Sequence, residues 1–118
     1  MEILVVREPI AAQVLKPLAD AWYGTLIKGV ADLGRGVIAL GGEWHMDANI
    51  VLIADGSDQV DVWGFNMYPD ETGDNAIEYI SLINIRPAQG NKTMELLDEQ
   101  LRGQLHALVS RLVPSLGL

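Results

Sequence analysis

The pattern of apolar and polar positions along the chain predicts an α+β protein. Alternating or short continuous apolar runs predict strands, and apolar residues spaced three to four apart predict helices. Residues 3–6 form a continuous run and predict a first strand. Residues 27–33 and 36–42 flank a Leu-Gly-Arg-Gly turn, which predicts a β-hairpin because glycine readily adopts positive φ. Pairing across this turn places Ile27, Ala31, Leu33, Ile38 and Leu40 on one face, and Val30, Asp32, Val37 and Ala39 on the other.

The stretch from Val60 to Thr93 predicts a longer β-hairpin that turns at residues 72–73. We expect its strands to set Trp63, Phe65 and Met67 against Ile80, Leu82 and Asn84, in a register that could slip by one residue. Both faces carry apolar residues. A sheet covered by helices on one side only would therefore expose an apolar face, which indicates a partner surface.

Two segments show helical periodicity. The first opens at Glu8-Pro9 and ends near Gly24, and Pro17 inside it predicts a kink or two short helices. Its apolar stripe consists of Ile10, Val14, Leu18 and Trp22. The second ends at Pro114 and Gly117, and we expect an ion pair between Asp98 and Arg102 on it. Its stripe consists of Leu97, Leu101, Leu105, Leu108 and Leu112.

The segment 48–55 has two interpretations. Asp47 is a good N-cap and Gly56 a good C-terminal stop, which favours a short helix. The apolar, largely β-branched run at residues 50–53 favours a strand instead, with a turn at residues 55–58. In sum, we expect a single domain over residues 1–118: an antiparallel β-sheet of four to five strands with N-terminal and C-terminal helices packed on it.

Composition and charge narrow the function classes. The 118 residues include no cysteine, which excludes disulfides, cysteine-ligated zinc and thiol nucleophiles. The net charge of −8 and the scattered lysines and arginines disfavour nucleic acid and anionic membranes as partners. No apolar run approaches the ~18 residues of a membrane-spanning helix, and the first apolar run fits a strand rather than a signal peptide. These features favour a cytoplasmic protein.

Glu43, His45 and Asp47 form the first candidate site. In an extended segment alternate side chains share a face, so these three could converge on zinc, manganese or iron. The alternative, which we favour, is that Asp47 caps a helix and His45 makes an ordinary hydrogen bond, because one well-placed histidine is a weak metal signal.

The second candidate is an anion site where the predicted hairpin meets the last helix. The first N–H groups of a helix lack internal partners and attract anions. Arg86 adds a guanidinium suited to a carboxylate or phosphate. The site would comprise Asn84, Arg86, Gln89, Asn91, Lys92 and Thr93. The alternative is that Asn91 or Thr93 caps the helix and Arg86 pairs with an acid.

Asn66 and Asn84 form the third candidate, since asparagine is depleted in strands and a buried amide needs partners. They predict either a structural hydrogen-bond network, which we favour, or the floor of a pocket that Trp63, Asn66 and Tyr68 would form.

The segments WGFNMYP, SLINIRPAQGN and GGEWHMD together resemble domain-of-unknown-function family 5674, a family of small bacterial proteins, over nearly the whole chain. The resemblance implies more acid and alanine after the His-x-Asp, which supports a helix over 48–55, although this sequence has Asn49-Ile50-Val51 there. It implies a fold and no activity or catalytic residue.

From these observations we expect a non-enzymatic homodimeric module that binds a small anion near Arg86, with no cofactor. Two alternatives stay open. One is a metal-dependent enzyme that uses Glu43, His45 and Asp47. The other is a regulatory partner for a basic protein, which the net charge of −8 favours.

Overall fold

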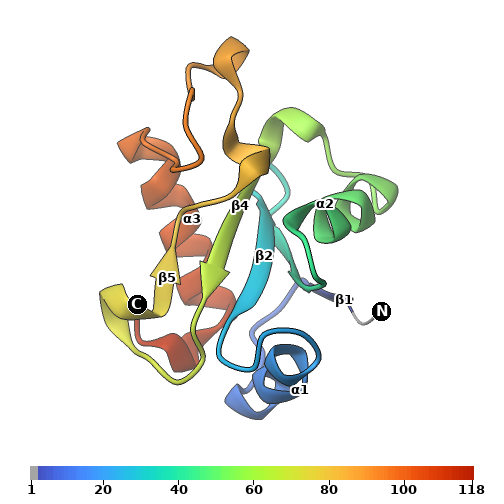
Figure 1. The fold of residues 1–118 in the computed structure, drawn as a ribbon, viewed down its shortest axis with the longest axis vertical. Coiled ribbons are helices and arrows are strands. Elements are labelled where there is room, and N and C mark those ends of the chain that lie inside the picture. The colour runs from blue at the N-terminus through green and yellow to red at the C-terminus, as the bar shows by residue number, and fades with distance from the viewer. Residues whose placement is uncertain (1–2) are drawn as a thin grey trace.

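A computed structural model describes residues 3–118, and its strands form one antiparallel sheet in the order β1-β3-β2-β4-β5 (Figure 1). The strands are β1 (Ile3–Val6), β2 (Ile27–Asp32), β3 (Val37–Gly41), β4 (Val62–Met67) and β5 (Ile77–Glu78). The helices are α1 (Leu15–Asp20), α2 (His45–Ala54) and α3 (Glu99–Leu112). The predicted α+β class, with N-terminal and C-terminal helices packed on an antiparallel sheet, is confirmed.

The β2–β3 hairpin forms as predicted, with Asp32 paired to Val37 at its tip. The Asp32 carboxylate closes the turn, since its Oδ1 accepts hydrogen bonds from the backbone N–H groups of Gly34 and Arg35, both at 2.9 Å. The two predicted faces are confirmed as well. One apolar cluster contains Ile27, Ala31, Ile38 and Leu40, and a second contains Val30, Val37 and Ala39.

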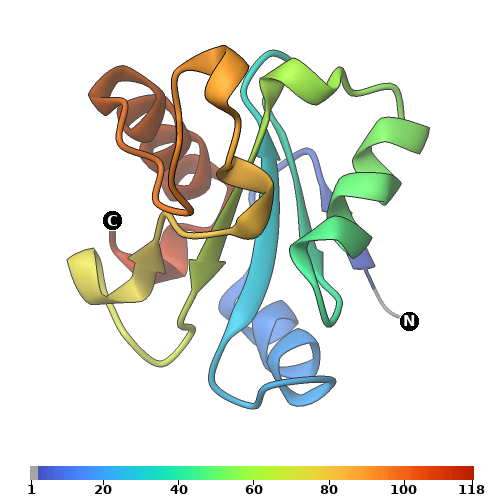
Figure 2. The same ribbon diagram turned by 45° about the horizontal axis from the view of Figure 1, so that its top comes forward.

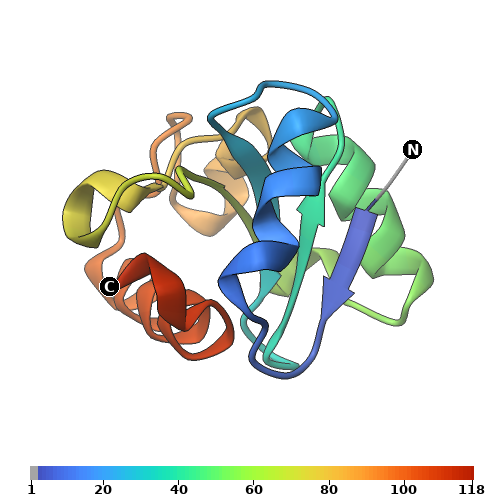
Figure 3. The same cartoon turned by 90° about the horizontal axis from the view of Figure 1, so that it is seen from below.

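Helices cover both faces of the sheet, contrary to the one-sided arrangement expected from the sequence. α1 and α3 pack on the first apolar cluster, whereas α2 packs on the second through Ala48 and Leu52. The view from below shows α1 in front of the strands, with α2 and α3 to either side (Figure 3). The bare apolar sheet face on which the expected homodimer rested is therefore absent.

The N-terminal helical segment is broken, as Pro17 predicts. A 3₁₀ turn at Ala12–Val14 leads into α1, which places the proline in the first turn, where its missing N–H leaves no bond unmade. The helix therefore begins later than the predicted Glu8-Pro9. Gly24 ends the segment with φ +80°. Trp22 lies beyond α1 and is exposed, so it does not belong to the buried stripe.

α2 settles the two interpretations of 48–55 in favour of a helix, but the helix begins at His45 rather than after Asp47. Asp47 lies in its first turn, where the Oδ2 atom accepts a hydrogen bond from the Trp44 N–H at 2.9 Å. Asp47 therefore caps the start of the helix, as in the alternative that we favoured, but it does so from the third helical position, and the N-cap residue is Trp44. The strand alternative for the β-branched run is wrong, because burial of Ala48 and Leu52 one turn apart outweighs local β propensity.

The predicted long hairpin is the main error in the fold. β4 forms, but β5 is only two residues long and pairs Glu78 with Asn66. Residues 79–96, which we call the 79–96 segment, fold back on themselves instead, with bridges at Ile80–Glu95 and Arg86–Asn91. Figure 2 shows this segment, yellow to orange, between β5 and α3. The expected cross-strand partners Ile80, Leu82 and Asn84 are thus not in a strand.

α3 begins at Glu99, after the N-cap Asp98, whose Oδ1 accepts hydrogen bonds from the N–H groups of Gln100 and Leu101. The predicted Asp98–Arg102 ion pair is wrong, because Arg102 pairs with Glu95 at 2.9 Å. Leu105, Leu108 and Leu112 of the predicted stripe are buried, whereas Leu97 precedes the helix and is 57% exposed. Among residues 3–118 the structure has no helix long and apolar enough to span a membrane.

Candidate functional site

Asn84 completes the edge of the sheet where β5 stops. Its fully buried side chain accepts a hydrogen bond from the Gly64 N–H at 2.8 Å and donates one to the Gly64 carbonyl at 3.0 Å. A neighbouring strand would satisfy these same two backbone groups. The backbone approaches closely here, since a Cβ on Gly64 would lie 2.5 Å from the Ser81 Cβ. Asn84 therefore has a structural role.

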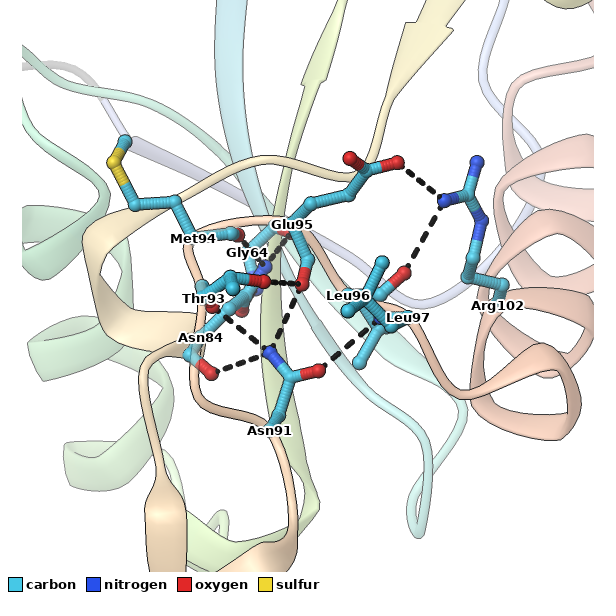
Figure 4. A network of polar contacts seen from close by, with 9 residues as sticks. All are labelled: Gly64, Asn84, Asn91, Thr93, Met94, Glu95, Leu96, Leu97 and Arg102. Carbon is cyan, nitrogen blue, oxygen red and sulfur yellow. Dashed lines mark hydrogen bonds and ion pairs between the residues drawn. The ribbon is translucent and has the colours of Figure 1, made fainter.

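Asn91 organises the far side of the 79–96 segment (Figure 4). Its Nδ2 lies 2.8 to 3.0 Å from the carbonyl oxygens of Asn84, Thr93 and Glu95, and its Oδ1 accepts the Leu97 N–H at 3.1 Å. Four backbone groups are satisfied by one buried side chain. The backbone groups around Asn91 therefore need no further hydrogen-bond partner.

Arg86 joins the 79–96 segment to the start of β4. Its guanidinium carbon lies 4.1 Å from the centroid of the Trp63 ring, and its donors are committed to the protein. The acceptors are the carbonyl oxygens of Gln59, Val62 and Ile83 and the side chain of Gln89. Arg86 therefore holds the 79–96 segment against residues 59–62.

The premise of the predicted anion site is therefore wrong. α3 starts at Glu99, so its first N–H groups are not at Arg86 or Asn91, and Asp98 caps two of them. Lys92 and Thr93 are exposed, and the Thr93 hydroxyl donates to the Glu95 carbonyl. The fold does bring Asn84, Arg86, Gln89 and Asn91 together, but around backbone carbonyl groups.

The extended geometry that would have joined Glu43, His45 and Asp47 is also absent, because His45 and Asp47 lie in the first turn of α2. Asp47 bonds to the Trp44 backbone, and His45 Nε2 lies 2.9 Å from the Phe65 carbonyl oxygen. Within residues 3–118 no group of three or more histidine, aspartate and glutamate side chains is placed to hold a metal ion.

A cavity of about 490 Å³ lies between β2, β4, the start of α2 and the 79–96 segment, and we call it the α2 pocket. Its walls are mainly apolar. They consist of Lys28, Trp44, His45, Met46, Asn66, Ile80, Ser81, Leu82, Ile83 and Met94. Four large side chains of this wall are exposed: Trp44, Met46, Leu82 and Met94. An apolar pocket of this size with a few polar groups is typical of small-molecule sites.

His45 supplies the first polar group of the α2 pocket. Burial lowers the pKa of its imidazole below the ordinary value of 6.5, and the positive charge of Lys28 lowers the pKa further, against opposing hydrogen bonds to Phe65 and Asn66. The ring is therefore neutral at pH 7. A carbonyl oxygen only accepts, so the contact with Phe65 puts the proton on Nε2 and leaves Nδ1 with a lone pair.

Lys28 supplies the second polar group of the α2 pocket. Its Nζ lies 5.1 Å from the centroid of the Tyr23 ring and 5.3 Å from that of Trp44, within the range of a cation–π contact. Tyr23 is itself held, because its hydroxyl donates to the Glu43 carbonyl. Among residues 3–118, Lys28 has no carboxylate partner within 4 Å. The aromatic rings therefore place a cation at the pocket and leave it unpaired.

Asn66 supplies the third, and its hydrogen bonds are incomplete. Its Nδ2 makes two long contacts, to Glu78 Oε1 at 3.4 Å and to the Ile80 carbonyl at 3.3 Å. Its buried Oδ1 has no hydrogen bond of good geometry, although the amide lies close enough to His45 to affect the imidazole pKa. Buried amides usually have partners for all of their hydrogen-bonding groups, so the Oδ1 of Asn66 can accept a further hydrogen bond.

A family model described as "Protein of unknown function (DUF5674)" matches residues 4–112. The chain belongs to the DUF5674 family. No curated protein and no solved structure gave a significant match. The family therefore agrees with the resemblance seen in the sequence, and the site of this DUF5674 protein has to be argued from its own geometry.

Sequence reasoning found part of the α2 pocket of this DUF5674 protein. It named His45 as a candidate metal ligand and Asn66 as a candidate pocket floor, while it favoured a structural role for each, and both residues line the same cavity. Trp63 and Tyr68 do not line it. Trp63 lies in the core beneath Arg86, and the Tyr68 hydroxyl donates to Glu78 Oε1 at 2.6 Å, which raises the Tyr68 pKa to about 12.

The residues that sequence reasoning missed are Lys28 and the apolar rim. One signal was available, because the large apolar residues Trp44 and Met46 flank His45 in the sequence. The contribution of Leu82 and Met94 could not be found in this way, since it depends on the fold of the 79–96 segment.

Proposed function

We propose that this DUF5674 protein is a non-enzymatic binding module that holds a small, largely apolar molecule in the α2 pocket. The observation that carries the proposal is the pairing of His45 and Asn66 in an apolar cavity. The first is a neutral imidazole of fixed tautomer, and the second is a buried amide with an incomplete hydrogen-bond set. Such groups fix the orientation of a ligand that the apolar walls bind.

The exposed rim supports the same proposal. Trp44, Met46, Leu82 and Met94 keep large apolar surfaces in contact with water, which costs free energy roughly in proportion to the exposed area. Covering them with a ligand recovers that free energy. Methionine suits such a wall because its flexible thioether adapts to different shapes and contacts aromatic rings favourably.

The experiment is a titration of ¹⁵N-labelled protein with 3-phenylpropionamide and with 3-phenylpropionate, followed by two-dimensional NMR. We expect saturable shifts at Trp44, His45, Met46 and Met94. Leu82→Asp should abolish them, because it puts a charge into the apolar wall at a residue that is 66% exposed.

Leu97→Asp is the matched control, since Leu97 is similarly exposed and lies outside the pocket. It should bind as the wild type does. The proposal fails when neither compound shifts the pocket resonances, or when Leu82→Asp binds both as well as Leu97→Asp does.

A further inference from the structure

The α2 pocket contains one formal charge, and that charge is positive. Of its ten lining residues only Lys28 is ionised at pH 7, because His45 is neutral and the other eight carry no ionisable group. The chain as a whole has a net charge of −8. A lone cation in the pocket of an acidic protein is therefore a local feature that the overall composition does not explain.

The ammonium group of Lys28 is also held in position by contacts with aromatic rings. The rings of Tyr23 and Trp44 both lie within about 5 Å of its ammonium group, and the Tyr23 hydroxyl is anchored on the Glu43 backbone. Aromatic faces attract an ammonium ion but leave its three N–H donors without strong acceptors. Among residues 3–118 no acidic side chain pairs with it.

The N-terminal end of α2 contributes to the electrostatic potential at the same wall of the pocket. α2 begins at His45, so the positive end of its dipole lies beside the pocket, although the Asp47 carboxylate on Trp44 offsets part of that potential. A single lysine faces the cavity, and the Glu78 carboxylate lies 3.4 Å from the Asn66 amide that lines it, so the local field favours one negative charge at Lys28 rather than several.

We propose that the ligand of the α2 pocket is a small monocarboxylate, whose carboxylate group pairs with Lys28 while its apolar body lies against Met46, Leu82 and Met94. This assignment rests on the proposed function, since it names the chemical class of the molecule that the pocket binds. The cavity of about 490 Å³ is of the size that small-molecule ligands occupy.

The experiment compares 3-phenylpropionate with its neutral amide, 3-phenylpropionamide, by titration calorimetry at pH 7.5 and low ionic strength. The two compounds share an apolar body and differ in charge. In the wild type the carboxylate should bind about tenfold more tightly, as expected for one charge-assisted contact. The preference should shrink as salt is added, because the rim of the pocket is open to solvent.

Lys28→Met keeps the apolar stem of the side chain and removes the charge, so it should abolish the tenfold preference for the carboxylate over the amide. Lys92→Met makes the same change in net charge at an exposed residue outside the pocket and should keep the preference. Two-dimensional NMR spectra of both variants check that each is folded.

The outcomes separate the two proposals. Equal affinity for the carboxylate and the amide in the wild type, or a preference that survives Lys28→Met, overturns the monocarboxylate assignment and leaves the binding pocket in place. Failure of both compounds to bind the wild type overturns the proposed function itself, and the assignment with it.

Discussion

Arg86 and Lys28 are two cations that lie over aromatic rings, but they differ in their hydrogen-bond partners. Arg86 lies on Trp63 and donates to three backbone carbonyl groups and to Gln89. The ammonium group of Lys28 lies beside two aromatic rings. Within residues 3–118 it has no hydrogen-bond partner and no acidic partner. The first cation holds two loops together, whereas the second keeps its donors available.

Asn84 and Asn66 repeat the contrast. Both are buried amides, Asn66 in β4 and Asn84 beside it. Asn84 makes short hydrogen bonds to both backbone groups of Gly64, whereas Asn66 makes two long contacts and leaves its Oδ1 without a good partner. A satisfied polar group stabilises the fold, and an unsatisfied one costs stability unless a ligand completes it. This difference separates Asn84, whose role is structural, from Asn66 in the α2 pocket, which we assign to binding.

The largest expected effect comes from breaking the Asn84 contact. Asn84→Ala leaves the N–H and C=O of Gly64 buried without partners, and we expect it to lower the free energy of unfolding by about 3 kcal/mol, given roughly 1–3 kcal/mol for each such group. Asn66→Ala removes only long contacts and should cost less than about 1 kcal/mol. Urea unfolding monitored by circular dichroism measures both. Equal losses in the two variants would contradict the contrast between the amides.

A smaller effect is expected for the two cations. Arg86→Met leaves the carbonyl groups of Val62 and Ile83 without their donor and should lower the free energy of unfolding by about 2 kcal/mol. Lys28→Met should lower it by no more than about 1 kcal/mol, because it removes the cation–π contacts with Tyr23 and Trp44 and no hydrogen bond or ion pair. The same urea experiment measures this pair. A loss for Lys28→Met as large as that for Arg86→Met would show that Lys28 is structural.

The smallest expected effect is a pH dependence from His45. Its folded-state pKa lies below the unfolded value of 6.5 because of burial. Below about pH 6.5 the unfolded chain takes up a proton that the folded chain resists, so this contribution to stability is full above that pH and falls as the pH falls toward the lowered value.

Urea unfolding at pH 7.5 and pH 5.5 tests this pH dependence with His45→Gln, which cannot titrate. The wild type should lose more stability than the variant between the two pH values. An identical loss in both proteins would mean that the imidazole is not buried in its neutral form.

Local patterns predicted the elements whose residues contact their neighbours along the chain. The β2–β3 hairpin followed from glycines at its turn, and the buried leucines of α3 followed from their spacing. β4 was also correct, because its run of mostly apolar and small residues is typical of a strand that is covered on both faces. In each of these elements, local propensity and tertiary packing favour the same structure.

The 79–96 segment could not be predicted in this way. Its residues Ile80 to Arg86 alternate like a strand, but Asn84 and Arg86 take over the backbone groups of β4 that a strand would have paired with. Those are side-chain contacts over twenty or more residues, and no local pattern reports them. The α2 pocket shares this origin, since half of its wall comes from that segment, and sequence reasoning therefore reached only His45 and Asn66.

One titration tests the central claim most directly. ¹⁵N-labelled wild-type protein is titrated with 3-phenylpropionate, and the backbone, indole and imidazole resonances are followed. Our expectation is a set of saturable shifts centred on Lys28, Trp44 and His45, with Arg86 and Asn91 unaffected. Saturable shifts centred on Arg86 and Asn91 instead, or no saturable shift at all, would contradict it.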